Sequence, residues 1–194
     1  MSKLQSICVF CGASPGVRPE YVSMAEAMGA ELVRRGIRLV YGGGTVGLMG
    51  TVSRAVMNRG GSVTGIIPRS LQIQEQASHT ISELVVVESM TGRKVLMFER
   101  SDGFITMPGG FGTLDELFEA ITFGQLGIHT KPVGLLNISG FFDPLLVWID
   151  GAIDQGFVRP YHRGLLLVDS DPAALIDKME AYQAPEGLVV WKNK

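Results

Sequence analysis

Two glycine-rich segments of this chain have the composition of loops that bind anions. The first, YGGGTVGLMG, covers residues 41–50, and the second, PGGFGTLDE, covers residues 108–116. Each follows a short apolar run and precedes a longer amphipathic run, so each is expected to join a strand to the start of a helix. Glycine lets the backbone approach an anion closely, and a helix N-terminus presents N–H groups with a favourable partial charge. Both segments therefore predict phosphate binding.

The first segment leaves two interpretations open. It lacks the lysine of the P-loop pattern GxxxxGK[ST], which argues against an NTPase, and it matches the dinucleotide fingerprint only loosely. Its glycines either bind phosphate, which we favour, or allow tight packing between a strand and a helix. A third short segment, CGASP at residues 11–15, follows the first expected strand. The candidate phosphate or loop contacts are Gly12, Ser14, Gly43, Gly44 and Gly47.

Glu116 is the side chain of the second segment that could take part in catalysis. The spacing Thr113-x-x-Glu116 matches a capping box, in which the glutamate bonds back to the start of its own helix, and spacing alone favours this role. A carboxylate in the first turn beside an anion-binding loop repels phosphate, however, so it suits the sugar end of a ligand. There it would stabilise the positive charge that develops on a sugar when a glycosidic bond breaks.

Short apolar runs alternate with longer amphipathic runs along the chain. Strands are expected at residues 4–10, 37–41, 62–67, 84–87, 104–107, 133–136 and 165–168. Helices are expected at residues 19–35, 46–59, 90–100, 113–126, 143–155 and 172–182. This alternation predicts an α/β fold, a doubly wound and mostly parallel sheet of about seven strands with helices on both faces. Ligands bind such sheets at the carboxyl ends of the strands, where all three segments are expected to meet.

Length and composition exclude several function classes. A chain of 194 residues, 46% of them hydrophobic, suits a single domain over residues 1–194 with a peripheral tail from about residue 185. The formal charge of −2 offers no basic field for nucleic acid. No apolar run approaches the roughly 18 residues of a membrane span, and the N-terminus lacks the features of a signal peptide. We expect a cytoplasmic protein that binds neither nucleic acid nor membranes.

Metal and redox chemistry find little support in the sequence. Cys8 and Cys11 have CxxC spacing, but they are expected on a strand, where positions three apart point to opposite faces, and no second ligand pair is present. The histidines at positions 79, 129 and 162 lack the spacing of metal ligands. We therefore expect no metal. Residues 68–82, with weak periodicity and many polar side chains, are the best candidate for a mobile loop.

The second glycine-rich segment closely resembles a family signature. Residues 108–116 match the pattern PGGxGTxxE of the LOG ("Lonely guy") proteins, which are cytokinin riboside 5'-monophosphate phosphoribohydrolases once mislabelled as lysine decarboxylases. Further segments fit in order along nearly the whole chain: VFCGAS, YGGG, GLMG, QLGIH and KPVGLLN. The resemblance implies a Rossmann-like domain without a cofactor. It also implies hydrolysis of the N-glycosidic bond of purine nucleoside monophosphates, AMP included, to free base and ribose 5-phosphate.

The resemblance also implies the residues of the site. The family's catalytic pair is an arginine from an MHxRK segment and the glutamate of the signature, which fall on Arg93 and Glu116. Here the segment is MTGRK, residues 90–94, so the usual histidine is absent while Arg93 and Lys94 remain. The implied substrate contacts are Glu75, Arg93, Lys94, Gly109, Gly110, Phe111, Gly112, Thr113, Leu114, Asp115, Glu116 and Thr122.

Short members of the LOG family form homodimers that often complete the pocket with residues from the neighbouring subunit, so the resemblance implies a homodimer here. The sequence adds some support. Phe118, Phe123 and Leu126 make the expected helix at residues 113–126 apolar on more than one face, so part of it is available to a partner.

Two classes of function remain open. The leading hypothesis is a nucleotide N-glycosidase that acts on a small-molecule nucleotide. The alternative is a carrier or sensor that holds a nucleotide or phosphorylated cofactor without turnover. The glycine-rich loops serve both, but an anion binder gains nothing from a carboxylate in its pocket, so Arg93 together with Glu116 favours the enzyme. A phosphoribosyltransferase is disfavoured, because we find no acidic pair after a strand to hold a diphosphate donor with magnesium.

Overall fold

The protein is built on a parallel β-sheet. The computed structural model describes residues 4–72, 80–186 and 188. The strands are β1 (Ser6–Phe10), β2 (Arg38–Tyr41), β3 (Val63–Pro68), β4 (Glu83–Val87), β5 (Gly103–Thr106), β6 (Val133–Leu136) and β7 (Leu166–Asp169). They form one seven-stranded sheet in the order β4-β3-β2-β1-β5-β6-β7, and every strand pairing in the described part of the chain is parallel. The predicted α/β fold is confirmed.

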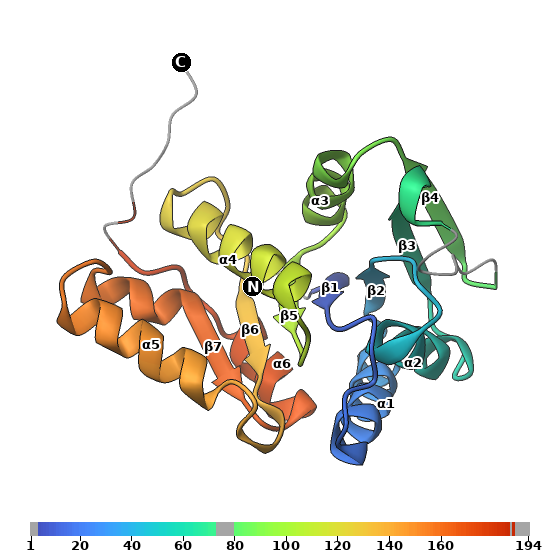
Figure 1. Ribbon diagram of the computed structural model, residues 1–194, viewed down its shortest axis with the longest axis horizontal. Helices are drawn as coiled ribbons and strands as arrows, with labels where there is room; N and C mark the ends of the chain where they lie inside the picture. The colour runs from blue at the N-terminus through green and yellow to red at the C-terminus, as the bar shows by residue number, and fades with distance from the viewer. Residues whose placement is uncertain (1–3, 73–79, 187, 189–194) are drawn as a thin grey trace.

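An α-helix follows each strand except β3, which is followed by the 3-10 helix η1, as can be seen in Figure 1. The α-helices are α1 (Pro19–Arg35), α2 (Gly47–Met57), α3 (Met90–Glu99), α4 (Phe111–Gln125), α5 (Asp143–Asp154) and α6 (Pro172–Glu180). Short 3-10 helices lie at η1 (Arg69–Leu71), η2 (Ile138–Gly140) and η3 (Pro160–Leu165). Each predicted helix and strand is present with ends that lie within two residues of the prediction. Of the loop expected at residues 68–82, residues 73–79 lie outside the described part of the chain.

Helices pack on both faces of the sheet. Successive side chains of a strand point to opposite sides, so the sheet contributes to two hydrophobic clusters. On β1, Ile7 and Val9 belong to a hydrophobic cluster with buried residues of α1, α2 and α6. Cys8 and Phe10 belong to a second cluster with residues of α3, α4 and α5. Cys11 is a member of the first cluster, so the two buried thiols lie on different faces, as the CxxC spacing on a strand predicts.

The order of the strands creates a crevice beside β1. The chain builds the sheet outward from β1 to β4, and then returns to the other side of β1 with β5. The helix after β1 covers one face and the helix after β5 covers the other, so the two connections diverge at their common edge. Such a switch point is where open α/β sheets bind ligands.

Candidate active site

A cavity of about 300 Å³ lies at this switch point. It is lined by the end of β1 and the loop that follows it, and by residues at the starts of α2, α3 and α4. Gly12, Gly42 and Gly110, one from each of the three predicted segments, line it together. The structure therefore brings the three segments to one edge of the sheet, although they are far apart in the sequence.

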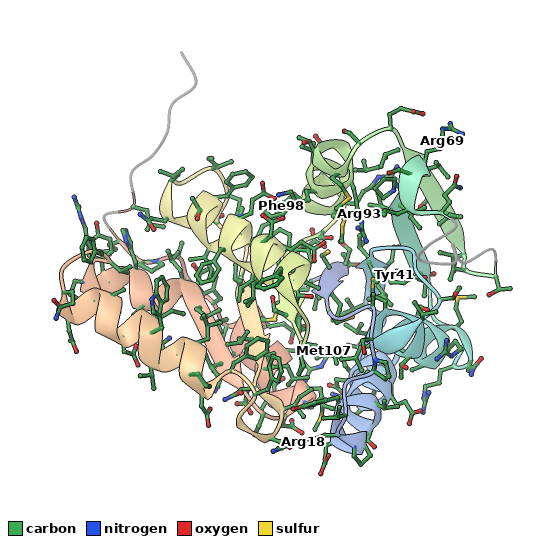
Figure 2. All side chains as sticks on the ribbon, viewed as in Figure 1. Arg18, Tyr41, Arg69, Arg93, Phe98 and Met107 are labelled. Atoms are coloured by element: carbon green, nitrogen blue, oxygen red, sulfur yellow. The ribbon has the colours of Figure 1, made fainter. Side chains whose placement is uncertain are left out.

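Arg93 lies on the wall of the cavity and is held by backbone carbonyls. Its side chain is 5% exposed. Its Nε donates to the carbonyl of Ile66 (3.1 Å), and Nη2 donates to the carbonyl of Gly42 (3.0 Å). Figure 2 shows Arg93 below α3, on the side that faces Tyr41 at the end of β2. Because guanidinium stays protonated in proteins, these bonds hold a permanent positive charge at a fixed place in the cavity wall.

Glycine at position 42 leaves the space that the guanidinium of Arg93 occupies. A Cβ there would overlap Nη2 of Arg93 and would lie 2.9 Å from Sδ of Met49. Real Cβ atoms do not approach other heavy atoms so closely. The first glycine-rich segment therefore has a definite role, which is to let the arginine of α3 reach the backbone at the end of β2.

Glu116 lines the same cavity from α4, and its charge adds to burial in raising the pKa of two thiols, Cys8 on β1 and Cys11 just after it. Burial and then Glu116 raise the pKa of Cys8 well above its ordinary value, while Arg93 lowers it. Burial and Glu116 likewise raise the pKa of Cys11. Both thiols are therefore protonated at neutral pH, which argues against either of them as a nucleophile. The opposite charges of Glu116 and Arg93 both act at the end of β1.

The N-terminus of α4 is open toward the cavity. Its N-cap is Gly110, which has no side chain with which to cap the helix. The first turn begins at Phe111, and the N–H of Leu114 is the donor to the carbonyl of Gly110 (3.1 Å). The N–H groups before Leu114 belong to the unpaired donors of a helix start, which attract anions. Around Gly110 and Gly112, no atom of the described residues lies within 4 Å of where a Cβ would be.

This geometry corrects the interpretation of Glu116 as a helix cap. Thr113 lies inside the first turn of α4 and is buried, because the helix begins at Phe111 and its N-cap is Gly110. A capping box needs the threonine at the N-cap. The Thr113-x-x-Glu116 box is therefore not formed, and Glu116 lies in the second turn rather than the first.

The N-terminus of α2, by contrast, is already occupied. The N–H groups of Leu48 and Met49 donate to the carbonyl of Gly12 (3.0 and 3.3 Å). A Cβ at Gly47 would overlap the backbone of Ala13. Of the two interpretations left open for the first segment, this geometry favours tight packing, since the loop after β1 takes the place that a phosphate would need.

The chain matches known proteins over most of its length. The family model described as "Possible lysine decarboxylase" matches residues 49–179. A protein of Oryza sativa subsp. japonica named probable cytokinin riboside 5'-monophosphate phosphoribohydrolase LOGL2 is 49% identical over 193 residues, or 100% of this chain and 79% of that protein. Arabidopsis thaliana LOG5, named cytokinin riboside 5'-monophosphate phosphoribohydrolase, is 47% identical over 193 residues, or 100% of this chain and 85% of that protein. The chain belongs to the LOG family.

Solved structures of low sequence identity share the fold of this LOG-family chain. The molybdenum cofactor binding protein of Rippkaea orientalis superposes with a TM-score of 0.69 at 24% identity, covering 91% of this chain and 95% of that one. The molybdenum cofactor carrier protein of Chlamydomonas reinhardtii gives 0.68 at 21% identity, covering 91% and 96%. At such identities the likeness concerns the fold alone.

Only part of the family signature lines the cavity. Gly110, Gly112, Thr113, Asp115 and Glu116 do so. The remaining residues of the segment have other surroundings. Gly109 packs against Thr113, and a Cβ at position 109 would overlap Oγ1 of that side chain. Phe111 is exposed, and Leu114 packs against the second hydrophobic cluster.

Two implied substrate contacts lie outside the cavity, and a third is not among the described residues. Lys94 is ion-paired with Asp115 and does not line the cavity. Thr122 is exposed on α4, where it borders a shallow groove with Phe118 and Phe123. Glu75 lies outside the described residues. Of the loop candidates, Gly43 packs on Ile66 and Ile67 instead of lining the cavity, and Ser14 is exposed, its Oγ 3.4 Å from the N–H of Gly16.

The sequence did not identify several residues of the cavity wall. Met49, Leu71, Met90 and Met97 supply apolar surface there. Met49 and Met97 sat at core positions of amphipathic helices, so their types gave no sign that they also face a cavity. When a helix borders a cavity, one apolar face packs into the core and also lines the cavity. Only the tertiary structure shows which residues do which.

The described residues contain neither a cluster of side chains that could bind a metal ion nor a helix that could span a membrane. They contain no group of three His, Cys, Asp or Glu side chains that could hold a metal. His129 is packed against the ring of Phe104, and burial, followed by the charge of Lys131, lowers its pKa to about 4. It is therefore neutral at pH 7, and it is partly buried. None of the described helices is both long and apolar enough to span a bilayer.

Proposed function

We propose that this protein hydrolyses the N-glycosidic bond of purine nucleoside 5'-monophosphates, those of cytokinin ribosides and AMP, and releases free base and ribose 5-phosphate. The observation that carries the proposal is the convergence of three groups in one cavity: the open start of α4, the Glu116 carboxylate one turn further along, and the buried Arg93. The names of relatives at 47–49% identity agree with this chemistry.

In this proposal the helix start of α4 holds the 5'-phosphate. Its N–H groups and helix dipole attract the dianion, and the absence of side chains at Gly110 and Gly112 lets it approach the backbone. Binding energy gathered at the phosphate, remote from the bond that breaks, orients the sugar against Glu116.

Glu116 then acts on the sugar. Cleavage of a ribosyl C–N bond builds positive charge on the ribose, as in glycoside hydrolysis. A carboxylate near the anomeric carbon stabilises that charge or orients the attacking water. Arg93 supports the reaction as a fixed positive charge that holds the ligand and the departing base, because an arginine does not readily give up a proton.

A panel of substrates tests the proposal. Purified protein is incubated with AMP, N6-isopentenyl-AMP, adenosine and ATP, and free base is assayed. We expect base release from the monophosphates, and a kcat/KM for adenosine that is lower by about 100-fold or more, since adenosine lacks the phosphate anchor. Equal turnover of adenosine and AMP would contradict the anchor. Binding of AMP in calorimetry without any release of base would favour the carrier instead.

We also propose that the enzyme is a homodimer that pairs through α4 and α5. Large apolar side chains are exposed on these helices, with Phe111 of α4 at 95% and Trp148 of α5 at 60%, and Phe157 just after α5 is 88% exposed. Such a patch is unusual on a monomer and suits a second copy. Thr122 lies on α4 beside the patch, where it is available to the cavity of a partner.

Light scattering at micromolar concentration tests the dimer. We expect about twice the mass of one chain, and a shift toward the monomer in Trp148→Asp, because a charge would then be buried in the apolar contact. The matched exposed change Glu26→Gln on α1 should leave the mass unaltered. A fully active monomer would contradict both the dimer and the role of Thr122.

A further inference from the structure

Lys94 connects the two helices that carry Arg93 and Glu116. Its Nζ lies 3.0 Å from Oδ2 of Asp115 and 3.2 Å from Oε2 of Glu119. Asp115 and Glu119 are four residues apart on α4, so their side chains lie on one face and a single ammonium reaches both. In the sequence Lys94 directly follows Arg93, and Asp115 directly precedes Glu116. The Lys94–Asp115 ion pair therefore joins the two residues that are the sequence neighbours of Arg93 and Glu116.

The surroundings of Lys94 make this contact more than a surface ion pair. Its side chain is 20% exposed and that of Glu119 is 26% exposed, whereas that of Asp115 is 60% exposed, so the contact with Glu119 is the sheltered one. Burial alone would lower the pKa of Lys94, but the bonds to Asp115 and Glu119 raise it above its ordinary value. The ammonium is therefore charged and held at neutral pH, whereas an exposed pair would be screened and mobile.

The position of the bridge along the helices is informative. Toward the C-terminal end of α3, the ring of Phe98 packs edge-on against Phe123 of α4 (5.4 Å between centroids). Toward the N-terminal end, where Arg93 and Glu116 face the cavity, Lys94 makes the connection. An ion pair has a defined length and direction, so it fixes the separation of the two helices at the level of the cavity.

We propose that Lys94 is a positioning residue, which holds α3 against α4 so that Arg93 and Glu116 meet the same substrate, and that it does not itself bind the phosphate. The inference rests on the proposed function. A misplacement of about 1 Å can lower a rate by about 100-fold. We therefore expect Lys94→Met to lower kcat for AMP by about 10- to 100-fold and to change KM by less than about twofold.

Three further variants separate positioning from direct binding. Lys94→Arg keeps a cation that reaches both carboxylates, and should retain most of kcat. Glu119→Gln removes the partner that does not line the cavity, and should lower kcat in the same direction as Lys94→Met but by a smaller factor. Adding Glu119→Gln to Lys94→Met should cost nothing more, because both changes remove the same contact. Lys178→Met, which breaks the pair with Asp169 (2.8 Å) on the edge strand β7, is the matched control.

The outcomes are distinct. A raised KM at unchanged kcat in Lys94→Met would show that Lys94 contacts the substrate, and unchanged kcat and KM would show that the bridge is dispensable. Either result overturns the inference.

Amide hydrogen exchange gives a readout that needs no turnover. Residues 90–99 should exchange faster in Lys94→Met than in wild type or Lys178→Met. Unaltered exchange would overturn the inference. If the wild-type protein releases no base from any nucleotide, the proposed function fails, and the exchange experiment still decides the role of Lys94.

Discussion

Glu116→Gln is expected to abolish most base release from nucleoside monophosphates, with a loss of about 10²- to 10⁴-fold in kcat. Glutamine keeps the shape of the side chain and can accept a hydrogen bond, but a neutral amide cannot oppose a positive charge on the ribose. The loss is typical of removing a positioned acid or base, and corresponds to about 3–5 kcal/mol at the transition state. Binding of AMP should persist, because the proposed phosphate contacts are backbone N–H groups of α4.

Stability should change little in the same variant. Glu116 lies in the second turn of α4, beyond the N-cap Gly110 and the first turn. Turnover and melting temperature are measured on one preparation, with Glu26→Gln on the exposed face of α1 as the control. Near wild-type turnover in Glu116→Gln would refute the proposed mechanism, whereas a large fall in melting temperature would reveal a structural role for the carboxylate.

The fold could be predicted from the sequence because its signal is local and repeated. Each apolar run is short enough for a buried strand and each amphipathic run is long enough for a helix, so alternation alone implies parallel strands with crossovers. α1 illustrates this, because Pro19 at its first turn and the left-handed Gly36 after its last residue mark both ends. Such start and stop signals depend on a few neighbouring residues.

The state of each glycine-rich loop could not be predicted, because it depends on a partner from another part of the chain. Both segments precede a helix, and both have the composition of an anion loop. The carbonyl of Gly12 fills the start of α2, and nothing in residues 41–50 announces that contact. At α4 the helix begins two residues earlier than the sequence suggested, which turns the apparent capping box into an interior turn.

Lys94 shows a similar limit within the candidate site. The resemblance to the LOG family implied it as a substrate contact, because it neighbours Arg93. Helical geometry sends adjacent side chains about 100° apart, so neighbours in the sequence serve different surfaces. In the structure Arg93 turns to the cavity while Lys94 turns to α4.

Gly42→Ala is expected to lower turnover by about 100-fold or more, although residue 42 carries no side chain that could react. The added Cβ would overlap Nη2 of Arg93 and crowd Sδ of Met49. Either the guanidinium moves or the loop after β2 moves, and in both cases the bond from Arg93 to the carbonyl of Gly42 (3.0 Å) is disturbed. A catalytic group displaced by about 1 Å is enough for an effect of this size.

A double-mutant cycle with Arg93→Ala decides whether the effect of Gly42→Ala passes through the arginine. Arg93→Ala alone should be nearly inactive, and it removes the atoms that the new Cβ would overlap. Adding Gly42→Ala to it should therefore lower turnover and melting temperature by much less than in the wild-type background, where overpacking should cost about 1–3 kcal/mol of stability. The contact of the new Cβ with Sδ of Met49 (2.9 Å) remains in both backgrounds. Gly164→Ala, whose Cβ would meet only Cγ of Pro185 among the described residues, at an ordinary contact distance of 3.4 Å, is the control. Independent losses that add in the double variant would show that Gly42 acts through the loop itself and not through Arg93.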